Sequence, residues 1–230
     1  MSRVIVSSAN SFSLRVSEIA PDKSISHRSV MFAMLASGTS EISNFLRAED
    51  TLNSLNIVKN LGAVIEDDGT IIKISSNGLK ESSEILDCGN SGTGMRLFCG
   101  LLSSADGHFV LTGDEYLRRR PMKRVTLPLR DIGAKLDGRD GGELAPLSIR
   151  GASLKAFNYE SKIASAQVKS AMILAALRAD GVCTYVEPDL SRDHTERMLM
   201  GMGANIKVDK LKTTITPMEG LLSPLIIKIP

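Results

Sequence analysis

Aromatic residues are scarce in this 230-residue sequence: they make up 4%, and tryptophan is absent. The formal net charge is only +2. A nucleic-acid-binding domain is expected to carry a basic face and often aromatic stacking platforms, so both observations argue against that class. No run approaches the 18 apolar residues of a membrane-spanning helix. The N-terminal residues also lack the uninterrupted apolar segment of a signal peptide.

The cysteine and histidine residues support neither a disulfide framework nor a metal site. The three cysteines form no C-x-x-C pair and stand far apart, which fits buried thiols in a reducing compartment. The three histidines lack the spacing of metal ligands. We therefore expect a cytoplasmic protein without a metal site, a nucleic-acid partner or a membrane partner.

One basic cluster stands out in this nearly neutral chain. The run LRRRPMKR, residues 117–124, holds five basic side chains in eight residues. It could bind nucleic acid, decorate a solvated surface or hold a small anion. The neutral overall charge favours the last two interpretations.

Three Gly-Ala dipeptides mark an internal repeat with a period of about 70 residues. Their glycines are Gly62, Gly133 and Gly203. Apolar residues one and four positions before each glycine have helical spacing, and the glycine is typical of a left-handed helix stop. Two short β-prone runs follow each time, which predicts a hairpin.

A second kind of helix precedes each surface helix. The segments KSISHRSVMFAMLASG, NSGTGMRLFCGLLSSADG and SAQVKSAMILAALRADG begin with small or polar residues and are apolar around most of the helix. That pattern is typical of helices in a domain interior. We predict an α/β (α+β) domain of three repeated β-α-β-α-β-β units around buried parallel helices, within residues 16–225. Residues 1–15 resemble a strand but fall outside the repeat.

Equivalent buried helices should present their N-termini at one end of the domain. These N-termini are rich in small polar residues, and a helix N-terminus combines unpaired N–H groups with a partial positive charge. Three together favour a binding site for an anion. Ordinary N-capping is the alternative, because serine and asparagine are preferred caps.

The surface helices add arginines near the same end. Pro121 and Ser191 stand at equivalent positions, twelve residues before Gly133 and Gly203, and are expected to begin their helices. Arg120 precedes Pro121 and Arg192 follows Ser191, so both should lie on one rim. Their guanidinium groups suit phosphate and carboxylate ligands. SRDHTER, residues 191–197, is a weak candidate for a Ser/His/Asp arrangement, because the three residues lie within one turn.

Six motifs, in order, resemble the 5-enolpyruvylshikimate-3-phosphate synthase family: PDKSISHR, GNSGTGMR, GDEYLRRRPM, PLSIRG, SAQVKSAMILAAL and SRDHTERML. The resemblance implies a transferase of the shikimate pathway. The family transfers the enolpyruvyl group of phosphoenolpyruvate to the 5-hydroxyl of shikimate-3-phosphate, releases phosphate and needs no cofactor. UDP-N-acetylglucosamine enolpyruvyl transferase shares the repeat but lacks the first and last of these motifs. That activity, and a non-catalytic anion-binding module, remain the alternatives.

The resemblance also implies roles for individual residues. Lys23 is implied as the catalytic residue of this part of the family fold, acting electrostatically. The residues implied in substrate binding are Lys23, Ser24, Arg28, Asn90, Gly92, Thr93, Arg120, Ser165, Gln167, Ser191 and Arg192.

The family has two such domains, whereas this sequence holds one set of three units. We therefore expect an N-terminal half, with residues 1–15 belonging to the absent second domain and residues 226–230 beginning the crossover towards it. The family's acid and base residues would lie in the missing C-terminal domain. We expect partial substrate binding without full catalysis.

Overall fold

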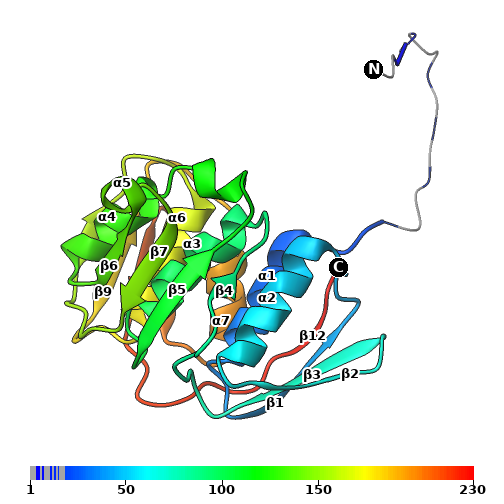
Figure 1. Ribbon diagram of the computed structural model, residues 1–230, viewed down its shortest axis with the longest axis horizontal. Helices are drawn as coiled ribbons and strands as arrows, with labels where there is room; N and C mark the ends of the chain where they lie inside the picture. Colours follow the sequence, from blue (N-terminus) through cyan, green and yellow to red (C-terminus); the bar gives the residue numbers. More distant parts are fainter. Residues whose placement is uncertain (1–3, 6, 8–10, 12, 14, 16–18) are drawn as a thin grey trace.

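The computed structural model describes residues 4–5, 7, 11, 13, 15 and 19–230. In this part of the chain the strands form three four-stranded sheets, and each sheet corresponds to one repeat unit (Figure 1). The sheet orders are β12-β1-β3-β2, β4-β5-β7-β6 and β8-β9-β11-β10. In all three sheets the strand that follows the buried helix has two neighbours. On one side an outer strand pairs with it in parallel, and on the other side a hairpin strand pairs with it antiparallel. The predicted repeat is therefore confirmed.

The units share one order of elements, except that the first has, among the described residues, no strand before its buried helix and receives β12 from the C-terminal end of the chain instead. The first contains α1 (Lys23–Ala33), β1 (Gly38–Ser43), α2 (Glu49–Asn60), β2 (Val64–Asp67) and β3 (Ile71–Ser76). The second contains β4 (Leu86–Asp87), α3 (Gly92–Leu102), β5 (His108–Thr112), the 3-10 turn η1 (Leu117–Arg119), α4 (Lys123–Asp131), β6 (Lys135–Gly138), the short turn α5 (Arg139–Gly142) and β7 (Leu144–Arg150). The third contains β8 (Asn158–Glu160), α6 (Ala166–Ala176), β9 (Cys183–Val186), α7 (His194–Gly201), β10 (Ile206–Asp209) and β11 (Lys212–Ile215).

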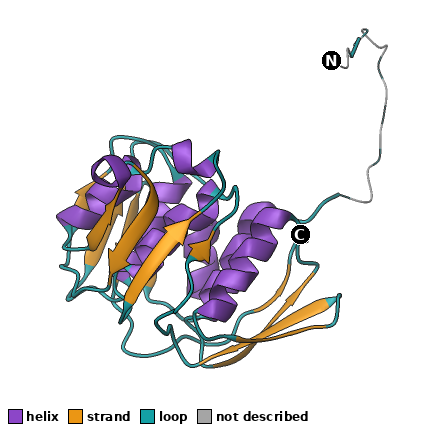
Figure 2. Ribbon diagram, viewed as in Figure 1, coloured by secondary structure: helices purple, strands orange, loops and turns teal. Residues whose placement is uncertain are grey.

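The helices α1, α3 and α6 form the interior, as their apolar sequences predict, and the strands lie towards the outside (Figure 2). The closest approach is between α3 and α6. A Cβ atom on Gly100 would lie 2.2 Å from the carbonyl oxygen of Ala171. Glycine at this position therefore lets the two helix backbones touch.

The three Gly-Ala glycines end the surface helices α2, α4 and α7. Gly62, Gly133 and Gly203 have φ angles of 100°, 102° and 93°. An L-residue with a side chain rarely adopts this left-handed conformation, which is why glycine recurs at the same place in each unit. Among the described residues, no helix is long and apolar enough to cross a membrane.

The C-terminal residues complete the first sheet, where β12 (Ile226–Lys228) pairs in parallel with β1. The interdomain crossover expected to begin at residues 226–230 stays a prediction. The edge of β1 needs a hydrogen-bonding partner, and this segment supplies it: Ile229 N donates to the carbonyl of Ser43 at 3.0 Å. Asp22 N donates to the carbonyl of Pro230 at 2.9 Å, beside the start of α1 (Figure 1). The strand expected within residues 1–15 falls largely outside the described residues.

Two predicted helix starts are wrong. Helix α4 begins at Lys123 and not at Pro121, because residues 117–119 first form the turn η1. Helix α7 begins at His194 and not at Ser191, whose hydroxyl donates to Oε2 of Glu187 at 2.5 Å.

Candidate functional site: an anion pocket at three helix N-termini

The N-termini of α1, α3 and α6 lie together, as the repeat predicts. Gln167 in the first turn of α6 donates from Nε2 to Oγ1 of Thr93 in α3 at 2.9 Å. His27 of α1 contacts Oγ of Ser91, the N-cap of α3, at 3.1 Å. Long-range side-chain contacts therefore join the beginnings of all three buried helices.

A cavity of about 170 Å³ opens at this point, which we call the anion pocket. This volume is well above the roughly 10–15 Å³ that a single enclosed water needs, so the cavity has room for a phosphate or carboxylate group. Its lining residues are Lys23, Asp50, Asn90, Ser91, Gly92, Thr93, Arg96, Arg120 and Gln167. Within the described part of the chain, Asp50 is the one acidic residue of this lining, which otherwise carries three cationic side chains and several polar groups.

The N-termini of the three buried helices are also capped by side chains, and this capping is compatible with anion binding. Asp22 accepts a hydrogen bond from Ile25 N at 2.7 Å, and Ser91 accepts one from Gly94 N at 2.9 Å. Ser165 caps α6 through Val168 N at a longer 3.4 Å. Each cap satisfies one first-turn N–H group, so capping removes only part of the positive potential at these helix ends.

Arg96 is a pocket residue that sequence reasoning missed. Its guanidinium group lies one helical turn after Gly92, donates to the Gly92 carbonyl at 3.1 Å and donates to the Pro121 carbonyl at 2.9 Å. Burial lowers its pKa to about 10, with the nearby charges of Arg124 and Arg120 acting in the same direction. The group stays protonated at neutral pH and brings a buried positive charge to the pocket wall.

Arg96 and Arg124 fix the side-chain orientation of Gln167. Its Oε1 accepts from Arg96 at 3.0 Å and from Arg124 at 2.9 Å, while its Nε2 donates to Thr93. An amide nitrogen carries two hydrogens, so one N–H of Gln167 remains to donate to an anionic ligand. Arg124, the last residue of LRRRPMKR, was also missed.

Gly92 is required by close packing of cations at the start of α3. A Cβ atom here would lie 2.8 Å from Nη1 of Arg96 and 3.2 Å from Nη1 of Arg120. The absence of a side chain thus brings two guanidinium groups to the helix N-terminus. Arg120 also donates to Oδ1 of Asn90, whose Nδ2 donates to Asp114 at 2.7 Å.

Lys23 forms an ion pair with Asp50 across the pocket. The lysine side chain is about half exposed, so it can exchange Asp50 for an anionic ligand at little cost. Asp50 was missed by the sequence analysis. Its carboxylate gives Lys23 a partner in the absence of ligand.

His27 is buried behind the pocket and acts as a link between helices. Its Nδ1 contacts Oγ of Ser54 at 2.8 Å and its Nε2 contacts Oγ of Ser91. Burial, followed by the charge of Lys23, lowers the pKa of His27 to about 4. The imidazole is therefore neutral at physiological pH. Nothing in the sequence motif distinguished this histidine from an exposed one.

The remaining predicted residues lie beside the pocket and not in its wall. Arg192 donates from Nη1 to Oγ of Ser24 at 3.2 Å, which places α7's leading loop against the start of α1. Arg28 is 3% exposed and bonds to protein atoms: Nε to Thr195 at 2.7 Å, and Nη2 to Ser170 at 2.8 Å. Its guanidinium group therefore links helices, and three of its five N–H groups are used in these bonds. The ligand contact that the motif implies for Arg28 stays a prediction.

The other features of the sequence contribute less. Arg119 of the basic run is exposed and pairs with Glu115 at 3.2 Å, outside the anion pocket. Among the described residues, no group of three or more His, Cys, Asp or Glu side chains is arranged to hold a metal ion.

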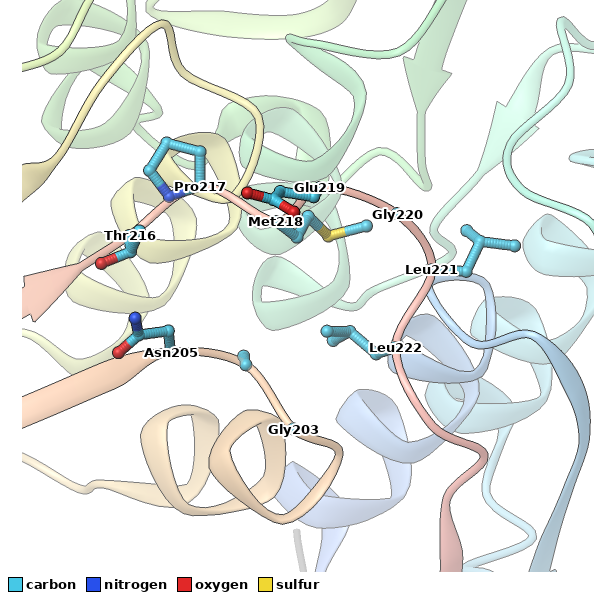
Figure 3. Close-up of a pocket in the computed structure, with 10 residues that line it drawn as sticks. Gly203, Asn205, Thr216, Pro217, Met218, Glu219, Gly220, Leu221 and Leu222 are labelled. Atoms are coloured by element: carbon cyan, nitrogen blue, oxygen red, sulfur yellow. The ribbon is translucent and has the colours of Figure 1, made fainter.

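A larger cavity of about 320 Å³ lies elsewhere, at the C-terminal end of α7 (Figure 3). Its lining includes Asn205, Thr216 and Glu219, and the lining residues within the described chain include no cation. A helix C-terminus carries a partial negative charge. This cavity therefore does not suit an anion.

Curated relatives match along the whole chain. A 3-phosphoshikimate 1-carboxyvinyltransferase of Sulfurimonas denitrificans is 80% identical over 230 residues, which is 100% of this chain and 54% of that protein. One from Nitratiruptor sp. is 61% identical over 236 residues, with the same two coverages. The chain thus spans about half the length of the curated relatives it matches.

Solved structures agree with these matches. Two structures of EPSP synthase from Acinetobacter baumannii superpose with TM-scores of 0.88 and 0.87, each at 40% sequence identity. The matched region covers 92% of this chain and 48% or 49% of theirs. With the family model for EPSP synthase (3-phosphoshikimate 1-carboxyvinyltransferase) matching residues 9–228 as well, the chain belongs to that family.

Proposed function

We propose that this chain is the N-terminal domain of an enzyme that transfers the enolpyruvyl group of phosphoenolpyruvate to the 5-hydroxyl of shikimate-3-phosphate and releases phosphate. The single observation that carries the proposal is the anion pocket, where Lys23, Arg96 and Arg120 meet the N-termini of the buried helices. Both substrates are small polyanions. Guanidinium forks and helix N-termini are the groups that bind such ligands best in proteins.

The layout of the site supports a division between the two substrates. Lys23, Gly92, Thr93, Arg120 and Gln167 line the anion pocket and are proposed to contact phosphoenolpyruvate. Asn90 is included there because its side chain orients Arg120.

The second group lies beside the pocket and is proposed to bind shikimate-3-phosphate. It consists of Ser24, Arg28, Ser165, Ser191 and Arg192, together with Lys23 and Gln167 from the pocket. The contact between Arg192 and Ser24 brings two of its members together from distant parts of the sequence. In this group Ser191 acts through neighbouring residues, because its hydroxyl hydrogen already bonds to Glu187. Arg28 keeps two of its five N–H groups for a ligand beside its bonds to protein atoms.

The cations have a clear chemical task in this reaction. The methylene carbon of phosphoenolpyruvate gains a proton, the 5-hydroxyl adds to the central carbon, and phosphate then leaves. Fixed positive groups neutralise the substrates and stabilise charge that shifts during addition and elimination. Lys23 is the proposed electrostatic catalyst because its ammonium group lines the anion pocket. We assign the proton-transferring acid and base to the second domain.

The proposed partner is accordingly the family's C-terminal domain, and this chain alone is proposed to bind substrate without full catalysis. A second domain closing over the pocket would exclude water and strengthen every electrostatic contact inside it. We also infer a cytoplasmic location, because all three cysteines are buried free thiols, as expected in a reducing compartment.

The proposal is tested by titrating the 230-residue chain with shikimate-3-phosphate while recording ¹H–¹⁵N spectra. We expect shifts of the Ser24, Gly92 and Ser165 amides on a single binding curve. A response to UDP-N-acetylglucosamine in place of shikimate-3-phosphate would support the related transferase instead. Turnover by the purified chain at the rate of a two-domain enzyme would contradict its assignment as an incomplete catalyst.

A further inference from the structure

Three ionisable side chains outside the anion pocket are almost completely buried. Lys169, Glu187 and Glu196 are 2%, 4% and 1% exposed. Nζ of Lys169 lies 2.7 Å from Oε1 of Glu187 and 2.8 Å from Oε1 of Glu196. One ammonium group therefore bridges two carboxylates in the interior, and we call these three residues the buried triad.

The buried triad closes a particular loop. Glu187 directly follows β9 and Glu196 lies in the first turn of α7, so the two carboxylates bracket the loop of residues 187–193. The middle of this loop is held as well. The Ser191 hydroxyl donates to Oε2 of Glu187 at 2.5 Å, and Nζ of Lys169 lies 3.5 Å from the Ser191 carbonyl oxygen.

A second set of contacts carries this order to the start of α1. Thr195, next to Glu196, accepts from Nε of Arg28 at 2.7 Å, and Nη1 of Arg28 donates to the Ser24 carbonyl at 3.0 Å. Arg192 reaches the hydroxyl of the same serine from the loop. Arg28 thus joins α7 to the start of α1, and Arg192 joins the loop itself to the same place.

Burial of these charges is not explained by stability alone. Replacing a buried ion pair by apolar groups of similar volume is often neutral or stabilising, because desolvation offsets the attraction between the charges. In addition, Oε2 of Glu196 is buried without a hydrogen-bond partner among the described residues. Burying this network costs free energy, and its hydrogen bonds have defined directions. It is therefore better suited to fixing the position of the loop than to stabilising the core.

We propose that Lys169 is a positioning residue, which holds the loop of residues 187–193 so that the Arg192 guanidinium lies beside Ser24 and meets the phosphate group of the ligand. The proposal rests on the proposed function for the identity of that ligand. Lys169 itself touches no substrate. Its effect on binding is transmitted through Arg192.

The test removes the three charges together while keeping side-chain volume, in the variant K169M/E187Q/E196Q. This avoids leaving two carboxylates buried without their ammonium partner, as Lys169→Met alone would. We expect cooperative unfolding to be retained and shikimate-3-phosphate to bind at least tenfold more weakly. Ile215→Val is the matched control, because Ile215 is buried in the same sheet but pairs with Cys183, at the far end of β9 from Glu187. The control should bind as the unmodified chain does.

A double-mutant cycle distinguishes positioning from a general structural role. If Lys169 acts through Arg192, the triple substitution should have little further effect on affinity in an Arg192→Ala background. Equal losses of affinity in both backgrounds would overturn the proposal. So would a triple variant that binds as tightly as the unmodified chain.

A ligand-free measurement separates this inference from the proposed function. ¹⁵N relaxation should show a rigid Arg192 amide in the unmodified chain and an order parameter below about 0.6 in the triple variant. An Arg192 amide that stays rigid in the triple variant would overturn the positioning role. If the unmodified chain fails to bind shikimate-3-phosphate, the proposed function fails, while this measurement still decides whether the buried triad orders the loop.

Discussion

Arg96 donates from Nη1 to Oε1 of Gln167 at 3.0 Å and so joins α3 to α6 beside the anion pocket. The two residues are 71 positions apart in the sequence. Arg96 also satisfies the carbonyl groups of Gly92 and Pro121, which connects the helix start to the basic run. One buried guanidinium group therefore organises three segments of the site.

Replacing Arg96 should weaken both the fold and the site. Arg96→Leu leaves two carbonyl oxygens without this charged donor, and we expect the free energy of unfolding to fall by about 2 kcal/mol. Urea unfolding followed by circular dichroism measures the loss. Arg119→Leu is the control: Arg119 is exposed and should have little effect on stability. Equal stability of the Arg96→Leu variant and the unmodified chain would contradict the role given to Arg96.

Gly92→Ala should affect binding more than stability. The new methyl carbon would lie 2.8 Å from a guanidinium nitrogen of Arg96 and 3.2 Å from one of Arg120, so it would displace both side chains. We expect phosphoenolpyruvate affinity to fall by about tenfold, equivalent to roughly 1.4 kcal/mol. Isothermal titration in the presence of shikimate-3-phosphate measures this change. Unaltered affinity would show that the two arginines do not need the space at Gly92.

The contact between α3 and α6 gives a prediction for stability alone. Gly100→Ala would put a methyl group 2.2 Å from the Ala171 carbonyl, so the helices must separate. We expect a loss of about 1–3 kcal/mol in the free energy of unfolding. Gly201→Ala is the matched control, because nothing lies within 4 Å of the added atom, and it should be neutral or slightly stabilising. Similar effects of the two substitutions in a denaturant titration would contradict the close packing.

His27 predicts a specific dependence of stability on pH. Its folded-state pKa is lowered to about 4 from an ordinary value near 6.5, so the unfolded chain binds a proton more readily than the folded one. The contribution of His27 is constant above pH 6.5 and decreases as the pH falls towards 4, by up to ~3 kcal/mol.

The comparison of unfolding curves at pH 7.5, 5.5 and 4.5 tests this prediction. His27→Gln cannot titrate, so the dependence attributable to His27 should disappear in that variant. An NMR titration of the His27 ring gives its pKa directly. A midpoint near 6.5 would exclude a buried, neutral imidazole and remove the reason for the expected pH dependence.

The repeat was predictable because it depends on local sequence. Helical spacing before Gly62, Gly133 and Gly203, and a left-handed stop at each glycine, are properties of a few neighbouring residues. The apolar circumference of the buried helix in each unit similarly required burial, whatever the remainder of the fold. Symmetry then placed the three N-termini together, and six of the predicted residues line the anion pocket: Lys23, Asn90, Gly92, Thr93, Arg120 and Gln167.

The sequence by itself therefore determined the elements, their order and the end of the domain where anions are expected. Only the tertiary structure decided which polar groups face the pocket and which form hydrogen bonds inside the protein. Arg28 and Arg96 both follow a helix N-terminus, yet the first bonds within the interior and the second lines the pocket. Long-range packing likewise determines that β12 pairs with β1 and that Lys169 forms ion pairs with Glu187 and Glu196. Local spacing fixes which face of an element a residue occupies, whereas the neighbouring element that meets this face is set by the packing of the whole chain.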